Sequence, residues 1–182
     1  MLNSFIVTGA SASGKTTLIN EARKGYTYLP THMTRKPRKG EQNGTDAIFI
    51  TEEQFINNFR EGDYLEPSLD FALLRNLGIY YGTPVSWIEN LSKEGFCASP
   101  VSIQMADEIA KRCDVCWVHL VCSDEDRLKR LLLRGISEEE AHARMRSGDS
   151  IFIPENADLI INTSEHSPEE ILQIINDYKR NA

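Results

Sequence analysis

Near its start the chain carries two glycines, a lysine and a threonine at a spacing that suits a phosphate chain. The run Gly9-Ala10-Ser11-Ala12-Ser13-Gly14-Lys15-Thr16 fits G-x-x-x-x-G-K-[ST], the P-loop pattern. Its glycines let the backbone curl so that successive N–H groups face phosphate oxygens. Lys15 is expected to reach the β- and γ-phosphates of ATP, and the Thr16 hydroxyl to bind Mg²⁺. The alternative is a glycine-rich turn with an incidental Lys-Thr pair.

A P-loop needs a strand before it and a helix after it, and both can be recognised in the sequence. Residues 2–7 are short and apolar enough for a buried parallel strand, and residues 15–23 have a helical pattern. The helix N-terminus adds partial positive charge where the phosphates would lie. The motif assigns ATP and Mg²⁺ as cofactors, with Thr16 as the metal ligand, and the expected nucleotide contacts are Gly9, Ala12, Ser13, Gly14, Lys15, Thr16 and Thr17.

Strand and helix patterns alternate along the rest of the chain, which is typical of parallel βαβ units. Further strands are expected at 26–29, 47–50, 64–69, 96–99, 115–122 and 158–162. Helices are expected at 51–60, 85–93, 105–112, 123–134, 137–146 and from 167 onward. Segments 31–45 and 80–84 are rich in turn residues and are expected to be loops.

This pattern predicts an α/β fold of the P-loop NTPase class, a parallel sheet flanked by helices with an acceptor-binding insertion and a lid. The length of 182 residues fits one domain. We expect its core at about 1–30 and 84–182, the insertion at about 31–83 and the lid at about 135–150.

A second group of charged residues follows the P-loop, and five basic side chains lie close together in it. It reads Thr31-His32-Met33-Thr34-Arg35-Lys36-Pro37-Arg38-Lys39-Gly40-Glu41. Guanidinium forks match phosphate oxygens in a bidentate way, and Pro37 and Gly40 stiffen and turn the segment. We call residues 31–41 the arginine loop. A basic loop that only faces solvent is the alternative.

Residues 34–41 with Gly44, Asp46 and Phe49 resemble the signature of the guanylate kinase family, and Leu65-Glu66 and Tyr80-Tyr81-Gly82-Thr83 are similar to two further family segments. The resemblance spans essentially the whole chain. It implies transfer of the γ-phosphoryl group of ATP to GMP or dGMP. It also implies contacts to the acceptor by Arg35, Arg38 and Tyr81 at its phosphate, by Glu66 at the guanine donors, and by Thr31 and Thr83 at the base edge.

Three arginines fall where the arginines of the lid fall in this family. Arg130, Arg134 and Arg144 are thereby implied to be catalytic together with Lys15, neutralising the phosphoryl group in transfer. The alternative is a set of solvated cations on helices, favoured in part by the helix C-terminus. Asn162, in Ile160-Ile161-Asn162-Thr163, resembles the segment beside the adenine of ATP.

Three departures from the family keep the acceptor open. Ala47 stands where the family has a tyrosine, residues 97–104 lack the family's acidic pair, and the 70–78 segment is longer. Asp70, Asp107 and Glu108 are candidates to replace that pair. These features favour, as an alternative, a ribose 1,5-bisphosphate phosphokinase making PRPP. A non-catalytic binding module of guanylate kinase type is a further alternative of another class. The intact Gly14, Lys15 and Thr16 speak against the binding module.

Composition limits the partners. The net charge of −7 argues against nonspecific nucleic-acid binding, and no apolar run is long enough to span a membrane. The P-loop lies so near Met1 that we expect no signal peptide, and hence a cytoplasmic monomer or homodimer acting on small molecules. Cys113-Asp114-Val115-Cys116 has CxxC spacing without a second pair, so buried free thiols are expected, with a zinc or redox site as the alternative.

Overall fold

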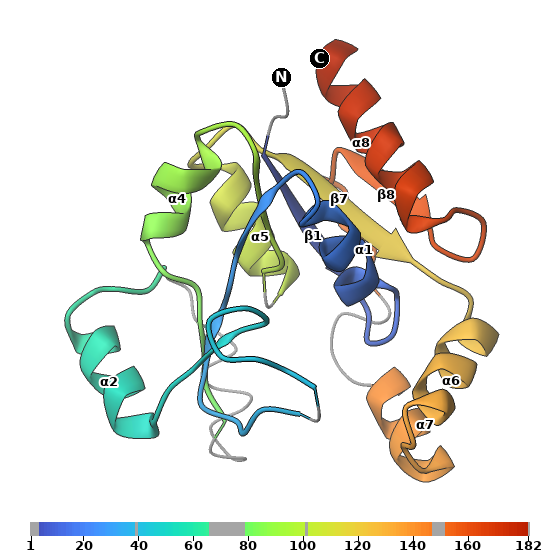
Figure 1. Cartoon of the computed structure of the whole chain (residues 1–182), viewed down its shortest axis with the longest axis horizontal. Coiled ribbons are helices and arrows are strands. Elements are labelled where there is room, and N and C mark those ends of the chain that lie inside the picture. The colour runs from blue at the N-terminus through green and yellow to red at the C-terminus, as the bar shows by residue number, and fades with distance from the viewer. Residues whose placement is uncertain (1–3, 39, 66–78, 101, 147–151, 182) are drawn as a thin grey trace.

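The computed structural model describes residues 4–38, 40–65, 79–100, 102–146 and 152–181. Its centre is a five-stranded parallel sheet with the order β2-β6-β1-β7-β8 (Figure 1). The strands are β1 (Phe5–Gly9), β2 (Thr27–Leu29), β6 (Phe96–Ala98), β7 (Cys116–Val121) and β8 (Leu159–Asn162). The predicted α/β class with a parallel sheet and flanking helices is confirmed.

Both faces of this sheet are covered, which explains why its strands are almost wholly apolar. On one face, α1 (Lys15–Ala22) and α8 (Pro168–Asn181) pack against the sheet through residues such as Leu18 and Ile175. On the other face lie α4 (Ser86–Leu91) and α5 (Ile103–Ala110), which bury Trp87 and Ile109. Each fully buried aliphatic or aromatic side chain stabilises the fold by roughly 1.5–3 kcal/mol.

A smaller three-stranded sheet lies beyond the carboxyl ends of the main strands, with the order β4-β3-β5. Its strands are β3 (His32–Met33), β4 (Ile48–Phe49) and β5 (Tyr81–Gly82). The loop predictions for 31–45 and 80–84 are therefore wrong where β3 and β5 lie. Each of these strands has two residues, which is too short for the alternation that identifies a strand in sequence.

Helix α2 (Glu52–Arg60) follows β4 and matches the predicted 51–60 segment, with Thr51 as its N-cap. Thr51 accepts a hydrogen bond from the N–H of Gln54, whose side chain accepts one from Thr51 in return. The helix packs Phe55 between the rings of Tyr64 and Tyr80, which closes a small aromatic core. The predicted strand at 64–69 is not found at Tyr64, which makes only an isolated bridge to Pro84; residues 66–78 lie outside the described residues.

Helices α6 (Asp124–Leu133) and α7 (Glu138–Arg146) form a hairpin at the same end of the sheet, drawn at the lower right of Figure 1. Ser123 caps α6 through the N–H of Asp126, and Gly135 ends it with a φ of 76°. Leu131 of α6 and Ala141 of α7 pack with Ala12 of the P-loop. The hairpin is therefore attached to the P-loop by apolar contact.

Candidate active site

The P-loop connects β1 to α1 and has the backbone that a phosphate cradle requires. Gly9 and Gly14 have φ values of 144° and 103°, and a Cβ at Gly9 would collide with the carbonyl oxygen of Leu120. Lys15 Nζ donates to the carbonyl of Gly9 and, at 2.8 Å, to that of Ala10. Ser13 Oγ is buried without a hydrogen-bond partner. An orphaned hydroxyl beside a lysine and a helix N-terminus fits a polyphosphate.

A cavity of about 380 Å³ opens beside the C-terminal half of the P-loop. Apolar side chains form much of its wall and a few polar groups complete it, a combination that suits a nucleotide base. Four predicted residues line it, Gly14, Thr17, Arg130 and Arg134. The full lining is Gly14, Thr17, Leu18, Arg130, Leu133, Arg134, Thr163, His166, Pro168 and Ile171. Asn162 is not part of this lining; its amide donates to Glu165 at 2.7 Å, and its neighbour Thr163 faces the cavity.

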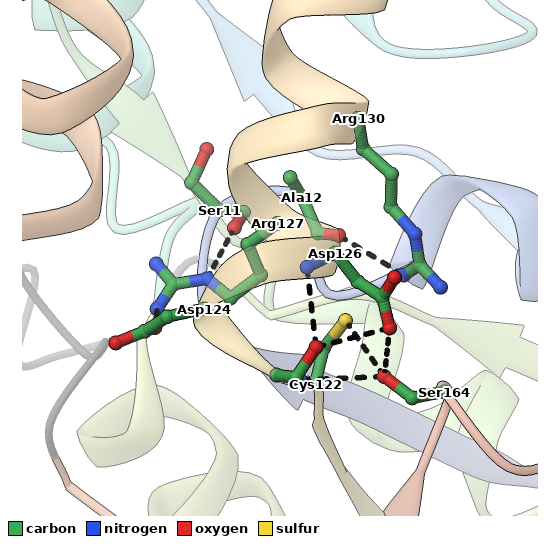
Figure 2. Close-up of polar contacts among 9 residues, drawn as sticks. Ser11, Ala12, Cys122, Asp124, Asp126, Arg127, Arg130 and Ser164 are labelled. Carbon is green, nitrogen blue, oxygen red and sulfur yellow. Dashed lines mark hydrogen bonds and ion pairs between the residues drawn. The ribbon is translucent and has the colours of Figure 1, made fainter.

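Arg130 holds the loop rather than projecting freely. Its Nη1 donates to the carbonyl of Ala12 at 3.2 Å (Figure 2). Nη1 also donates to Thr163 Oγ1, and Nη2 to the Thr163 carbonyl, both at 3.1 Å. Thr163 Oγ1 in turn donates to the carbonyl of Ser13 at 2.8 Å. Sequence reasoning missed Thr163, because only the parallel pairing of β7 and β8 brings it to the loop.

The arginine loop is ordered by one carboxylate. Arg35 gives two hydrogen bonds to Glu41, at 2.7 and 2.8 Å, and the backbone N–H of Arg38 donates to Glu41 Oε2 at 2.7 Å. These bonds, assisted by Tyr81, raise the pKa of the Arg35 guanidinium, and Arg35 holds the pKa of Glu41 below its usual value. Arg35 Nε is buried and unpartnered. Glu41 was part of the motif, but its orienting role was not predicted.

The guanidinium of Arg38 has charged neighbours of both signs. Partial desolvation and the positive charges of Arg35 and Arg144 lower the pKa of its guanidinium, and the carboxylate of Glu41 offsets part of this decrease. Arg144 lies on α7, where it also pairs with Glu140 at 2.6 Å. The structure thus brings two arginines of the arginine loop and one of the predicted lid together. A cluster of like charges of this kind is an anion-binding arrangement.

The residues expected at the acceptor base are only partly described. Thr31 and Thr83 are both buried, and the Thr83 hydroxyl has no hydrogen-bond partner. Thr31 donates weakly to the carbonyl of Ser99 at 3.5 Å. Glu66 lies outside the described residues. The two threonines neighbour each other through the pairing of β3 and β5, and the free hydroxyl of Thr83 suits a polar ligand.

A cavity of about 90 Å³ lies between the helix that follows the P-loop and the segment after the arginine loop. It is lined by residues of both, among them Lys15, Thr16 and Asp46. Asp46 pairs with Arg23 at 3.3 Å and accepts from the N–H of Gln42 at 2.8 Å. The Thr16 hydroxyl and this carboxylate are oxygen donors of the kind that suits Mg²⁺. In the part of the chain that the structure describes, no cluster of three metal-ligating side chains is found.

The candidates for the family's missing acidic pair are placed elsewhere. Asp107 pairs with Lys111 and accepts from Asn156 at 3.0 Å, and Glu108 pairs with Arg112. All five residues lie on α5 or against it, away from the residues that line the P-loop cavities. Asp70 lies outside the described residues. Ala47 is buried, and the carboxylate that shares a cavity with Thr16 is that of Asp46.

A buried polar chain lies directly under the P-loop. Trp117 Nε1 donates to Thr8 Oγ1 at 2.8 Å, and Thr8 Oγ1 lies 2.9 Å from His119 Nδ1. The indole can only donate, so Thr8 Oγ1 accepts from it, and the hydroxyl keeps its own O–H and a second lone pair for His119 Nδ1. Burial and the nearby charge of Lys15 lower the pKa of His119 to about 4. The imidazole is therefore neutral at pH 7, a feature that the sequence did not indicate.

The four cysteines are free thiols, as expected. Cys113 and Cys116 are buried, so their CxxC spacing does not present a surface pair. No helix in the described ranges has the length and hydropathy needed to cross a membrane.

Comparison with known proteins agrees with this geometry. The family model for guanylate kinase matches residues 1–177. A guanylate kinase of Methylobacillus flagellatus is 35% identical over 97 residues, an alignment covering 52% of this chain and 45% of that protein. One of Thermotoga maritima is 29% identical over 182 residues, covering 94% of this chain and 84% of its own length. The crystal structure of a guanylate kinase from Anaplasma phagocytophilum has a TM-score of 0.66 at 22% identity, covering 99% of this chain and 86% of that one. The chain belongs to the guanylate kinase family.

Proposed function

We propose that this protein transfers the γ-phosphoryl group of ATP to GMP or dGMP. The observation that carries the proposal is the cluster of Arg35, Arg38 and Arg144. Two of these cations come from the arginine loop and the third from α7, and the Arg38 guanidinium forms no ion pair with a carboxylate among the described residues. An acceptor phosphate placed there would neutralise this charge, next to a P-loop suited to ATP.

In this reaction the protein positions the substrates and stabilises charge, and it forms no covalent intermediate. A phosphate oxygen of GMP attacks the γ-phosphorus in line, forming the new P–O bond as the bond to the bridging oxygen of ADP breaks. Arg35 and Arg38 orient the attacking phosphate, while Lys15 and the P-loop N–H groups bind the ATP phosphates. Thr16 would hold Mg²⁺ through its hydroxyl, and the ion would supply further neutralisation of the phosphate charge. Arg134 and Arg144 add positive charge from the hairpin.

The parts of the chain have separate roles in this proposal. Residues of about 31–83 bind the acceptor, about 135–150 form a lid, and about 1–30 with 84–182 form the nucleotide-binding core. The cationic cluster supports this division, since it joins the arginine loop to α7. Closure over both substrates would exclude water and suppress hydrolysis of ATP.

Guanine as the acceptor base is supported by the relatives, which carry the name guanylate kinase. Glu66 would accept hydrogen bonds from the guanine N1–H and N2 amine, which are adjacent donors that adenine lacks. Thr31 and Thr83 would bind the base edge. The same relatives favour GMP over ribose 1,5-bisphosphate, and the P-loop with its lysine favours a kinase over a binding module.

An acceptor panel tests the proposal. The purified protein is incubated with Mg-ATP and GMP, dGMP, AMP, UMP, CMP, dTMP or ribose 1,5-bisphosphate, and release of ADP is followed. We expect turnover with GMP and dGMP at rates far above the others. Turnover with the sugar bisphosphate alone would reject guanine as the acceptor base, and silence with every acceptor would reject the kinase proposal.

A further inference from the structure

Arg127 is a buried cation that the proposed function leaves unexplained. It lies in the first turns of α6, and its side chain is 4% exposed. Arginine is rarely buried to this extent unless it is fully paired. Leu131, one turn further along α6, packs in an apolar cluster with Ala12 of the P-loop and Ala141 of α7. A buried charge at this place needs a reason beyond packing.

The contacts of Arg127 lead to the P-loop. Its Nε donates to the carbonyl of Ser11 at 3.1 Å, and its Nη1 pairs with Asp124 at 2.9 Å. Asp124 is a weak counter-charge, since its side chain is 80% exposed and solvent screens it. Arg127 Nη2 is buried without a hydrogen-bond partner. The guanidinium is therefore incompletely paired, and Ser11 of the P-loop is its hydrogen-bond partner outside α6.

Arg127 and Arg130 bind consecutive carbonyls of the loop. Figure 2 shows the two side chains leaving α6 toward Ser11 and Ala12, which Arg127 Nε and Arg130 Nη1 reach with hydrogen bonds. These are the carbonyls on either side of the Ala12 backbone. Ala12 is the only non-glycine residue with a positive φ, 64°, in the described part of the chain. That conformation is strained for alanine and persists where surrounding contacts impose it.

Because the peptide unit is planar, the hydrogen bond to the Ser11 carbonyl also fixes the direction of the Ala12 N–H. In a trans peptide the C=O of one residue and the N–H of the next point in opposite directions. Because Arg127 binds the Ser11 carbonyl from the α6 side, the Ala12 N–H points the other way, away from α6. In a P-loop the donors turned inward are those that cradle the phosphates.

We infer that Arg127 is a positioning residue of the phosphoryl-transfer site, which holds the Ser11–Ala12 peptide so that the Ala12 N–H faces the bound phosphates. It acts through Ser11 and is not itself placed against the substrate. Since it lies on α6, it also couples the α6–α7 hairpin to the shape of the loop. The inference rests on the proposed function only in that the loop binds a nucleotide polyphosphate.

Binding of ADP in the absence of the acceptor tests this role without depending on catalysis. Arg127→Met keeps the length of the side chain and removes its charge and donors. We expect ADP to bind roughly 10- to 100-fold more weakly by isothermal titration calorimetry, as for a lost charge-assisted hydrogen bond with its aligned donor. The dissociation constant of GMP should change by less than about 2-fold, because the arginine loop is untouched. Lys129→Met, an exposed cation on the same helix, is the matched control and should leave both constants unchanged.

Two further variants separate positioning from folding. Arg127→Gln retains an N–H donor for the Ser11 carbonyl without the charge, so its ADP affinity should lie between those of the parent and Arg127→Met. It also keeps the test available if the Met variant does not fold. Ala12→Gly removes the strain at positive φ. If Arg127 acts by holding Ala12, the loss caused by Arg127→Met should be smaller in the Ala12→Gly background.

The outcomes are distinct. Selective loss of ADP affinity, with partial recovery in Arg127→Gln and coupling to Ala12→Gly, supports the inference. Equal loss of ADP and GMP affinity with a lowered melting temperature would make Arg127 merely structural and overturn it. A folded variant with parental ADP affinity would also overturn it. A parent protein that binds no ADP would reject the proposed function itself.

Discussion

Replacing Arg38 by alanine should separate binding of the acceptor from binding of ATP. Arg38 donates its backbone N–H to Glu41, but its guanidinium forms no hydrogen bond or ion pair with the residues that the structure describes. The charges of Arg35 and Arg144 repel it, while that of Glu41 attracts it. The guanidinium therefore makes few interactions in the free protein, and in the complex it would bind the acceptor phosphate.

The expected magnitude follows from this asymmetry. A hydrogen bond from a guanidinium to a charged oxygen contributes about 1.5–3 kcal/mol, which corresponds to a roughly 10- to 150-fold rise in the KM for GMP. The KM for ATP should stay within about 2-fold, because Arg38 lines neither P-loop cavity. The free energy of unfolding should change by less than about 0.5 kcal/mol, since an exposed side chain without partners is removed.

Steady-state kinetics with each substrate varied in turn, together with urea unfolding, measure all three quantities. Lys36→Ala is the matched control, an exposed cation of the same loop whose side chain has no described partner. Arg35→Ala gives the contrast, since it breaks two bonds to Glu41 and should lower stability as well as acceptor binding. Equal rises in both KM values for Arg38→Ala, or a clear loss of stability, would refute the reasoning.

Two further predictions concern the loop and the residues beneath it. Lys15→Ala should lower kcat by at least about 100-fold with every acceptor, because the ammonium stabilises charge on the transferring group; retained turnover in the same ADP-release assay would remove the P-loop lysine from the mechanism. His119 takes up a proton near pH 4 when folded and near 6.5 when unfolded, so unfolding binds protons within that window and stability falls as the pH drops through it. Equilibrium unfolding should show a loss of at most about 3 kcal/mol between pH 6.5 and 4, which His119→Asn abolishes; an identical pH dependence in the variant would contradict a buried neutral imidazole.

The P-loop could be predicted because its signal is local. Eight consecutive residues specify the turn, the donors and the lysine, and the apolar strand before them is one of the clearest in the chain. The parallel sheet was predicted from the alternation of strand and helix patterns along the chain, which is also read from local sequence. β3 and β5 were not predicted, because a strand of two residues is too short to show an alternating pattern. Their pairing, which places Met33 opposite Tyr81, also joins segments that are far apart in the sequence.

The features of the site that could not be predicted from the sequence depend on contacts between residues far apart in the chain. Arg130 was predicted among the catalytic arginines, yet its bonds to Ala12 and Thr163 depend on where α6 and β8 meet the loop. Arg127 looks like one more cation on an amphipathic helix, and only the fold buries it against Ser11. Which charges are solvated and which are paired is decided by tertiary packing, and no spacing in the sequence encodes it.

Transfer of label tests the central proposal most directly. ATP labelled at the γ-phosphate is mixed with GMP and the protein at pH 7 in the presence of Mg²⁺, and the products are separated by chromatography. We predict that the label moves stoichiometrically into the β-position of GDP, with little inorganic phosphate. Label that appears only as inorganic phosphate, or that remains in ATP while GMP is unchanged, would contradict phosphoryl transfer to guanylate at this site.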